Sequence, residues 1–277
     1  FKEALHMAVN NELIKDDLYE AVNGEWLKTA KIPDDKPATG GFNDLVDEID
    51  KQLMDDFDAY AARKEKSDDS RFNEMIKLYR LAKKFDWRKK VGPQPLKRML
   101  ASVENLNSYE DYQSQWKNWI LAGMPSPISF DIDADMKNAT VYALFASSPS
   151  LILPDKSYYE AEKKAQHDQL LQLWSSMVEA LMDKLGYSKE EAKKIIDDAI
   201  KFDALLAPNV KSAEEAADYS KMYNPQTVAE LASATDQLDI AAIIKQLVGE
   251  KPEKVIVTEP EYFKALNKIL QDNFELF

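Results

Sequence analysis

Apolar residues recur at spacings of three and four through most of the chain, and polar residues fill the positions between them. This pattern is typical of helices that bury one face. It predicts a short first helix from Leu18 to Trp26. Further helices are predicted over 42–63, 72–87, 95–103, 109–123, 155–185, 189–207, 239–248 and 260–270.

The period changes to two in one region, which indicates strands. Ile128, Phe130 and Ile132 alternate with polar residues, as in a half-buried strand. A second strand is predicted over 139–146, so 128–146 is expected to form a small antiparallel β-hairpin. A short β-branched run at 255–257 is expected to be an edge strand. The predicted fold class is therefore mainly α with a small antiparallel β-hairpin.

The stretch from Asp17 to Leu45, DLYEAVNGEWLKTAKIPDDKPATGGFNDL, combines several breaks in the helical pattern. Gly24 is expected to loosen the first helix, and Pro33 and Pro37 to force an extended crossing. Two glycines then release the backbone just before the next helical pattern. We interpret this stretch as a helix, a crossover held by prolines and the start of a second helix.

Composition excludes several functional classes. The net charge of −13 disfavours nucleic-acid binding, which needs a basic patch that displaces counterions. The absence of cysteine excludes disulfides and thiolate metal sites, and it agrees with a reducing compartment. No apolar run approaches the roughly twenty residues that a membrane span needs. We therefore expect neither nucleic acid nor membrane as a partner.

The start of the chain has no basic region followed by an apolar block, as a signal peptide would have. The pair His6-Met7 resembles a cloning junction. On this interpretation residues 1–16 are a tag remnant and a flexible start, and the native protein is expected to be cytoplasmic.

Four separated motifs then point to a family. VNGEWL with IP, GGFNDL, LPDKSYY and VIVTEPEYFKAL occur in this order from residue 22 onward. Together they resemble the amino-terminal signatures of the neprilysin-like (M13) zinc metallopeptidases, most closely the bacterial oligopeptidase (endopeptidase O) branch. The resemblance covers nearly the whole chain from Asp17 onward.

The resemblance implies a two-lobed zincin peptidase that hydrolyses oligopeptides. One lobe carries an HExxH helix and a downstream glutamate, and the other is a multi-helix cap that encloses the cleft. On this basis 17–45 is a crossover segment that packs toward the catalytic lobe, and 46–277 is the helical cap domain. The carboxyl-terminal catalytic domain is expected to be absent from this chain and to be its partner in the parent enzyme.

The histidines do not provide the zinc site that the resemblance implies. HExxH chemistry needs two histidines four residues apart and a glutamate between them as general base. The chain contains only His6 and His167, and His167 in KKAQHDQLL has neither a second histidine nor a glutamate at that spacing. Zinc is therefore expected in the parent enzyme but not in this chain, which we expect to be inactive alone with no catalytic or metal residues.

Few other residues suggest chemistry. Adjacent carboxylates such as Asp55-Asp56 are more typical of solvated surface than of acid–base machinery, and the five tryptophans are expected to be core. Tyrosines near the motifs could line the peptide cleft: Tyr142, Tyr158 and Tyr159. Six residues are expected to be structural parts of the motifs: Asn23, Gly24, Trp26, Pro33, Phe42 and Pro154.

A second interpretation stays open, namely a stand-alone helical peptide-binding or protein-interaction module without catalysis. Such a module should end in a capped helix and a polar tail, whereas a truncated lobe should end with unburied apolar residues. Four apolar residues near the end favour truncation: Leu270, Phe274, Leu276 and Phe277.

Overall fold

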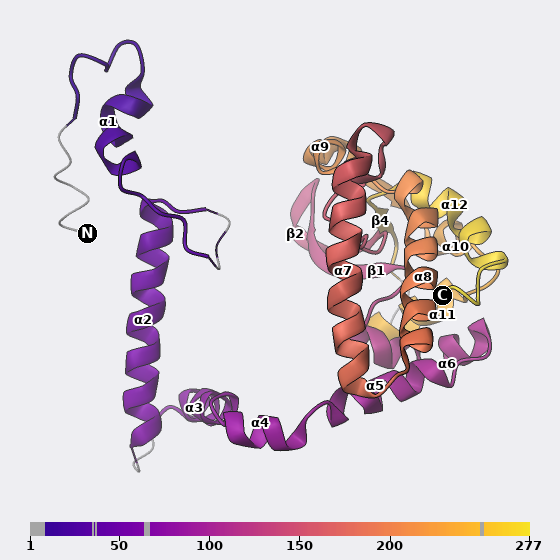
Figure 1. Cartoon of the computed structure of the whole chain (residues 1–277). Helices are drawn as coiled ribbons and strands as arrows, with labels where there is room; N and C mark the ends of the chain where they lie inside the picture. Colours follow the sequence, from indigo (N-terminus) through magenta and orange to yellow (C-terminus); the bar gives the residue numbers. More distant parts are fainter. Residues whose placement is uncertain (1–8, 35, 37, 64–66, 250–251) are drawn as a thin grey trace. The chain divides into compact units, whose positions relative to one another are not determined.

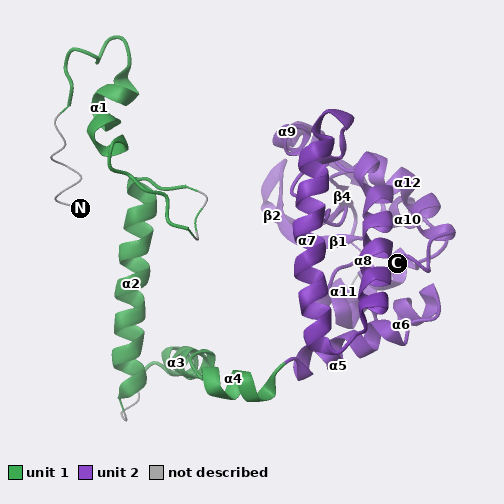
Figure 2. Ribbon diagram, in the orientation of Figure 1, with its two compact units in different colours: residues 1–92 green, residues 93–277 purple. Residues whose placement is uncertain are grey.

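Two units make up the chain, Phe1–Gly92 (unit 1) and Pro93–Phe277 (unit 2) (Figures 1 and 2). The computed structural model describes residues 9–34, 36, 38–63, 67–249 and 252–277. His6, Met7 and Pro37 lie outside the described residues. The predicted boundary between residues 45 and 46 falls inside a helix of unit 1.

Unit 1 is built from helices alone in its described part. These helices are α1 (Leu18–Leu27), α2 (Gly41–Ala62), α3 (Ser70–Ala82) and α4 (Phe85–Val91). Helix α1 starts at Asp17, whose side chain accepts a hydrogen bond from the Glu20 N–H at 2.8 Å. It continues through Gly24 to Leu27, so the prediction that Gly24 loosens this helix is wrong.

Aromatic packing joins α2 to α3. The ring of Tyr60 meets Phe72 edge to face at 4.8 Å, and Phe57 lies 5.4 Å from Tyr79. The Arg80 guanidinium donates to carbonyl groups in the last turn of α2 and just beyond it, which have no partners within that helix. This pair of helices is the best-packed part of unit 1.

Helices α3 and α4 replace the single helix predicted over 72–87. The chain breaks at Lys84, whose ψ of 65° is not helical. All seven residues of α4 are at least partly exposed, and Trp87 is 51% exposed, so the prediction that Trp87 belongs to a core is wrong.

Unit 2 contains a four-stranded mixed sheet that packs against helices (Figure 1). The sheet order is β1-β2-β4-β3. The strands are β1 (Ser129–Asp135), β2 (Asn138–Ser147), β3 (Asn224–Gln226) and β4 (Val255–Val257). The helices are α5 (Gln94–Glu104), α6 (Tyr109–Leu121), α7 (Lys164–Leu185), α8 (Lys189–Leu206), α9 (Ala213–Ala217), α10 (Val228–Ala232), α11 (Ile240–Val248) and α12 (Pro260–Gln271).

The antiparallel hairpin predicted over 128–146 is confirmed as β1 and β2, but the sheet is larger than predicted. Strand β4 is interior rather than an edge, because it pairs in parallel with β2 and antiparallel with β3. Its three side chains are fully buried. Strand β3 was missed because Asn-Pro-Gln has no strand pattern, and its proline is tolerated because β3 is an edge strand.

The far half of the hairpin extends beyond the core. Strand β4 is three residues long and supports only Leu144–Ala146 of β2. Ile132, predicted to face inward, is therefore 57% exposed, whereas Asp135 at the end of β1 is buried.

The start of α7 also differs from the prediction. Residues 156–163 form two short 3₁₀ turns, and α7 begins only at Lys164. The Asp155 carboxylate accepts from the N–H of Ser157 and closes the first turn, and Glu160 then adopts an extended backbone. At the other end, Gly186 takes a left-handed C-cap conformation with φ 90°, and Ser188 and Glu191 form the capping box of α8.

The core of unit 2 lies between the sheet and the helices α6, α11 and α12. Trp116 and Trp119 of α6 are buried, as predicted, and Tyr262 of α12 is fully buried. The end of the chain differs from the prediction: Leu270 is fully buried, and the rings of Phe274 and Phe277 pack 5.0 Å and 5.5 Å from Tyr109. These residues therefore do not form the unburied apolar end expected of a truncated lobe.

One hydroxyl serves two buried aromatic side chains of this core. Ser126 Oγ accepts from Trp116 Nε1 at 2.8 Å and lies 3.4 Å from the hydroxyl of Tyr112. Both aromatic residues are 0% exposed. The Ser126 hydroxyl therefore satisfies polar groups that water cannot reach.

We expect Ser126→Ala to lower the free energy of unfolding by about 1–3 kcal/mol, because it leaves the buried indole N–H without its acceptor. Urea unfolding followed by tryptophan fluorescence measures the change. Ser176→Ala on the exposed side of α7 is the control and should change stability by less than about 0.5 kcal/mol. Equal effects of the two variants would contradict the assignment.

Candidate substrate-facing surface

Carboxylates hold the segment that carries the LPDKSYY motif. Asp203 of α8 is 5% exposed, and its two oxygens accept from the Ile152 N–H at 2.8 Å and from the Tyr159 hydroxyl. Glu259 accepts from the N–H of Ser148 at 2.9 Å with one oxygen and from that of Lys211 at 2.8 Å with the other. The segment is thereby tied to α8 and to the β4–α12 junction.

Beside this segment lies a surface hollow of about 400 Å³. Residues 148–151, 153–156 and 210–213 line it together with Ala216 and Glu259. Both oxygens of Glu259 and both of Asp155 already accept backbone N–H groups, so neither carboxylate is positioned as a free acid or base.

Burial raises the pKa of Asp203, while the Tyr159 hydroxyl and the Ile152 N–H oppose that shift by donating to the carboxylate. Burial, followed by the hydrogen bond to Asp203, raises the pKa of the Tyr159 hydroxyl. Tyr159 therefore stays a proton donor to Asp203, and this pair fastens the motif rather than reacting.

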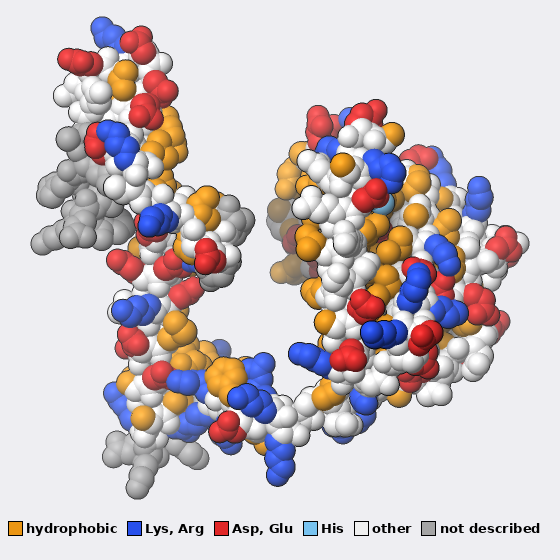
Figure 3. Space-filling model, in the orientation of Figure 1, with side chains coloured by type: hydrophobic (Ala, Val, Ile, Leu, Met, Phe, Trp, Pro, Cys, Tyr) orange, Lys and Arg blue, Asp and Glu red, His pale blue; other side chains and the backbone are white. Residues whose placement is uncertain are grey.

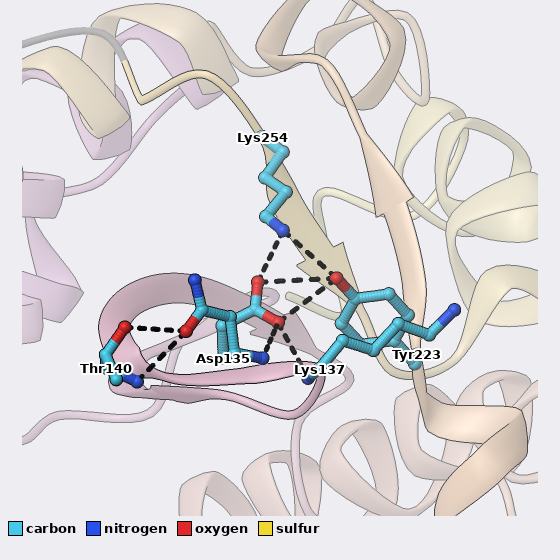
Figure 4. A network of polar contacts seen from close by, with 6 residues as sticks. Asp135, Lys137, Thr140, Tyr223 and Lys254 are labelled. Carbon is cyan, nitrogen blue, oxygen red and sulfur yellow. Dashed lines mark hydrogen bonds and ion pairs between the residues drawn. The ribbon is translucent and has the colours of Figure 1, made fainter.

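A second polar network closes the end of the hairpin (Figure 4). The Asp135 carboxylate pairs with Lys254 Nζ and accepts from the Tyr223 hydroxyl at 3.2 Å and from the Lys137 N–H at 2.8 Å. Lys254 Nζ also donates to the Tyr223 hydroxyl at 3.0 Å. The network connects the β1–β2 turn to the residues just before β3 and β4.

These contacts favour the charged forms of both ionic partners. Lys254, and after it the Lys137 N–H, lower the pKa of Asp135 to about 2. Asp135 in turn raises the pKa of Lys254. The carboxylate is therefore ionised and fully hydrogen-bonded, which makes it a fixed anchor for the hairpin turn.

The three predicted cleft tyrosines lie in different environments. Tyr142 of β2 is 80% exposed on the far half of the hairpin. Tyr158 is half-buried, with Lys163 Nζ 5.3 Å from its ring centre. Tyr159 is turned toward Asp203, and its ring lies 5.4 Å from that of His167. Tyr142 is therefore the one of the three whose ring is mostly open to solvent, and their role in a cleft stays a prediction.

The predicted motif residues are spread over unit 1 and the segment before α7. Asn23 Nδ2 donates to the Tyr19 carbonyl at 3.0 Å, and Phe42 is 85% exposed. The others divide by exposure: Gly24 is buried, Trp26 is half-buried, and Pro33 and Pro154 are exposed. Their structural roles remain predictions.

Sequence reasoning missed the Asp135 anchor. Asp135 and Lys254 are 119 positions apart, and nothing in the local pattern of either residue indicates the other. Such a site can be found only once the sheet order is known.

Within the described ranges, no group of three or more His, Cys, Asp or Glu side chains could hold a metal ion. His167 is half-buried, with Nδ1 3.0 Å from an Asp168 oxygen. None of the helices in those ranges has the length and apolar character needed to cross a membrane.

Comparison with known proteins identifies similar sequences. The family model described as "Peptidase family M13" matches residues 14–276. A putative zinc metalloproteinase of Streptococcus gordonii is 36% identical over 92% of the chain, and the neutral endopeptidase of Lactococcus lactis subsp. lactis is 36% identical over 95%. The chain spans 45% and 42% of the lengths of these two relatives.

Solved structures have the same fold. The crystal structure of PepO from Lactobacillus rhamnosis aligns with a TM-score of 0.84 and 28% identity, covering 95% of this chain and 41% of that one. The zinc metalloprotease Zmp1 of Mycobacterium tuberculosis, in complex with an inhibitor, aligns with a TM-score of 0.82 over 95% of this chain and 40% of that one. At 23% identity, the second match supports the fold alone.

We expect Asp135→Asn to lower the urea midpoint of unfolding at pH 7, because Lys254 loses its charged partner. A carboxyl group whose pKa is lower in the folded state stabilises the fold at pH values above its unfolded-state pKa, which is near 3.9 for Asp. This stabilisation is lost as the pH falls through the folded-state pKa of about 2. The difference between wild type and variant should therefore shrink from about pH 4 to pH 2.

Asp133→Asn is the matched control for this experiment. Asp133 lies two residues earlier on β1 and is exposed, and among the described residues its side chain accepts a hydrogen bond only from the Ala134 N–H. A loss of stability in Asp135→Asn that is independent of pH, or equal in the control, would contradict the anchor.

Proposed function

The chain belongs to the M13 peptidase family, and we propose that it is the amino-terminal, substrate-enclosing lobe of a zinc metalloendopeptidase that hydrolyses oligopeptides. The match over residues 14–276 supports the family, and the names of the relatives supply the proposed activity. We further propose that the parent enzyme cleaves on the amino side of apolar residues and that it is a cytoplasmic bacterial protein. The absence of cysteine supports that compartment.

The observation that carries this proposal is the incomplete burial of unit 1. In its described part, Ile76 is the only large apolar side chain that is buried. Large apolar side chains of α1 and α2 are open to solvent, including Leu18 at 60%, Tyr19 at 63%, Phe42 at 85%, Val46 at 54% and Ile49 at 46%. Exposed apolar surface of this extent is typical of an interface. We propose that the carboxyl-terminal catalytic domain of the parent enzyme covers it.

The residues of this chain do not fit a zinc site of the kind that the family implies. Two histidines are present, and neither has a second histidine four residues away. In such enzymes zinc polarises the scissile carbonyl and activates water. We therefore propose that zinc belongs to the parent enzyme outside this chain, and that this lobe contributes shape and substrate contacts.

Exposed apolar residues of unit 2 are our candidates for those contacts. On the far half of the hairpin Ile132, Val141 and Tyr142 are 57%, 46% and 80% exposed. On α7 Leu173 and Met177 are 62% and 63% exposed. These surfaces fit apolar side chains of a peptide substrate.

A stand-alone helical peptide-binding or protein-interaction module is the alternative. The relatives' greater length favours the lobe.

We expect the purified 277-residue chain to bind less than stoichiometric zinc and to leave peptides intact. Metal content by mass spectrometry and cleavage of a quenched fluorescent peptide measure these properties. The full-length parent protein should bind one zinc per chain and cleave the peptide. Activity in the 277-residue chain, or its absence from the zinc-loaded parent, would overturn the proposal.

In the parent enzyme we expect Tyr142→Ala to raise KM for peptides with apolar residues by about tenfold, because an exposed aromatic contact is lost. Leu121→Ala is the control, since Leu121 at the end of α6 is 70% exposed and is not part of the hairpin. An unchanged KM in Tyr142→Ala would remove Tyr142 from the substrate contacts.

A further inference from the structure

One short segment of unit 1 is positively charged, although the chain as a whole is negatively charged. Lys83–Lys90, with the sequence KKFDWRKK, contains five cations and one carboxylate in a chain whose net charge is −13. We call this run the basic segment. All eight of its residues are exposed. Figure 3 shows blue and orange side chains gathered together over α3 and α4.

Most cations of the basic segment have no carboxylate partner in the described part of the chain. Lys83 pairs with Asp58 of α2. The Arg88 guanidinium lies 5.3 Å from the ring centre of Phe85 and reaches the Ala82 carbonyl at 3.4 Å. Lys84, Lys89 and Lys90 form no ion pair among the described residues. Uncompensated like charges this close repel one another, so an anionic partner would stabilise the segment.

The basic segment also exposes aromatic surface. Phe85 and Trp87 are 60% and 51% exposed. They lie on α4, a seven-residue helix with no buried residue. A helix this short is not stable in water without packing against another surface. The partner must therefore offer apolar recesses as well as negative charge.

An extended polyanion fits unit 1 poorly. Helix α2 of the same unit contains seven carboxylates and one lysine. A membrane surface or a long nucleic acid would be repelled by that helix while it was attracted to the basic segment. A folded protein with a local acidic patch can contact the basic segment without bringing negative charge close to α2.

The relatives indicate where such a surface would come from. The chain spans less than half of the length of either curated relative, so most of a protein of that size lies outside it. We infer that the basic segment docks on an acidic patch with apolar recesses for Phe85 and Trp87, located on the remainder of the parent polypeptide. This inference rests on the proposed function and adds the site and the chemistry of the contact.

Zero-length crosslinking of the full-length parent tests the contact directly. A carbodiimide joins lysine to a carboxylate only when the two are in contact. We expect Lys84, Lys89 or Lys90 to be linked to an Asp or Glu beyond residue 277. Links confined to carboxylates of this chain, or no links, would overturn the inference. Peptidase activity in the same sample tests the proposed function independently.

Charge reversal tests the energetic role of the basic segment. In the parent, K84E/K89E/K90E should make the backbone amides of residues 83–91 exchange with solvent about tenfold faster, as expected when several ion pairs are lost. The variant F85S/W87S should also make the amides of residues 83–91 exchange faster, because it removes the two exposed aromatic side chains. The matched control K184E/K189E/K268E changes charge equally at exposed sites of unit 2 and should leave this exchange unchanged.

Circular dichroism should show equal helix content in all three variants. Unchanged exchange in both segment variants would overturn the inference. A second outcome would also overturn the inference: the amides of the wild-type basic segment exchange fast in the parent and become protected when anionic phosphatidylserine vesicles or RNA are added.

Discussion

Removal of apolar side chains from water is the constraint on which this structure depends. Unit 2 satisfies it with its own core, in which Tyr112, Trp116 and Tyr262 are fully buried. Unit 1 does not, because α1 and most of α2 leave their apolar faces open. The same physical rule therefore distinguishes one unit that has its own core from one whose apolar faces are not buried within the unit.

The helices were predictable because each amphipathic period is a local property. The breaks were less predictable: Lys84 divides α3 from α4, and Glu160 delays the start of α7, since both depend on backbone conformations that propensity does not specify. The interior position of β4 was missed because three β-branched residues fit an edge or a centre equally well. Strand order depends on contacts across more than a hundred residues.

The candidate site was harder to predict than the fold. Tyr142 was identified as part of a strand pattern and is exposed, as a contact residue must be. Tyr159 was identified within the LPDKSYY motif, yet its hydroxyl donates a hydrogen bond to Asp203. The environments of the two tyrosines differ because Tyr159 lies beside the buried carboxylate of Asp203. Asp203 is 44 positions away in the sequence, so no local pattern reveals the contact. Asp135 likewise uses its negative charge to fix a turn, so the carboxylates most constrained by this structure hold the backbone in place.

The position of β4 also has a consequence for how the protein is made. The β1–β2 hairpin is complete at Ser147, but the strand that packs beside it does not begin until Val255. At roughly 5–20 residues per second, a ribosome needs about 5–20 s to supply that strand. During this interval Leu144 and Ala146, which are buried in the finished sheet, have no β4 beside them. Until β4 is made, the edge of β2 lacks its partner strand, and unpaired strand edges favour aggregation of incompletely folded chains.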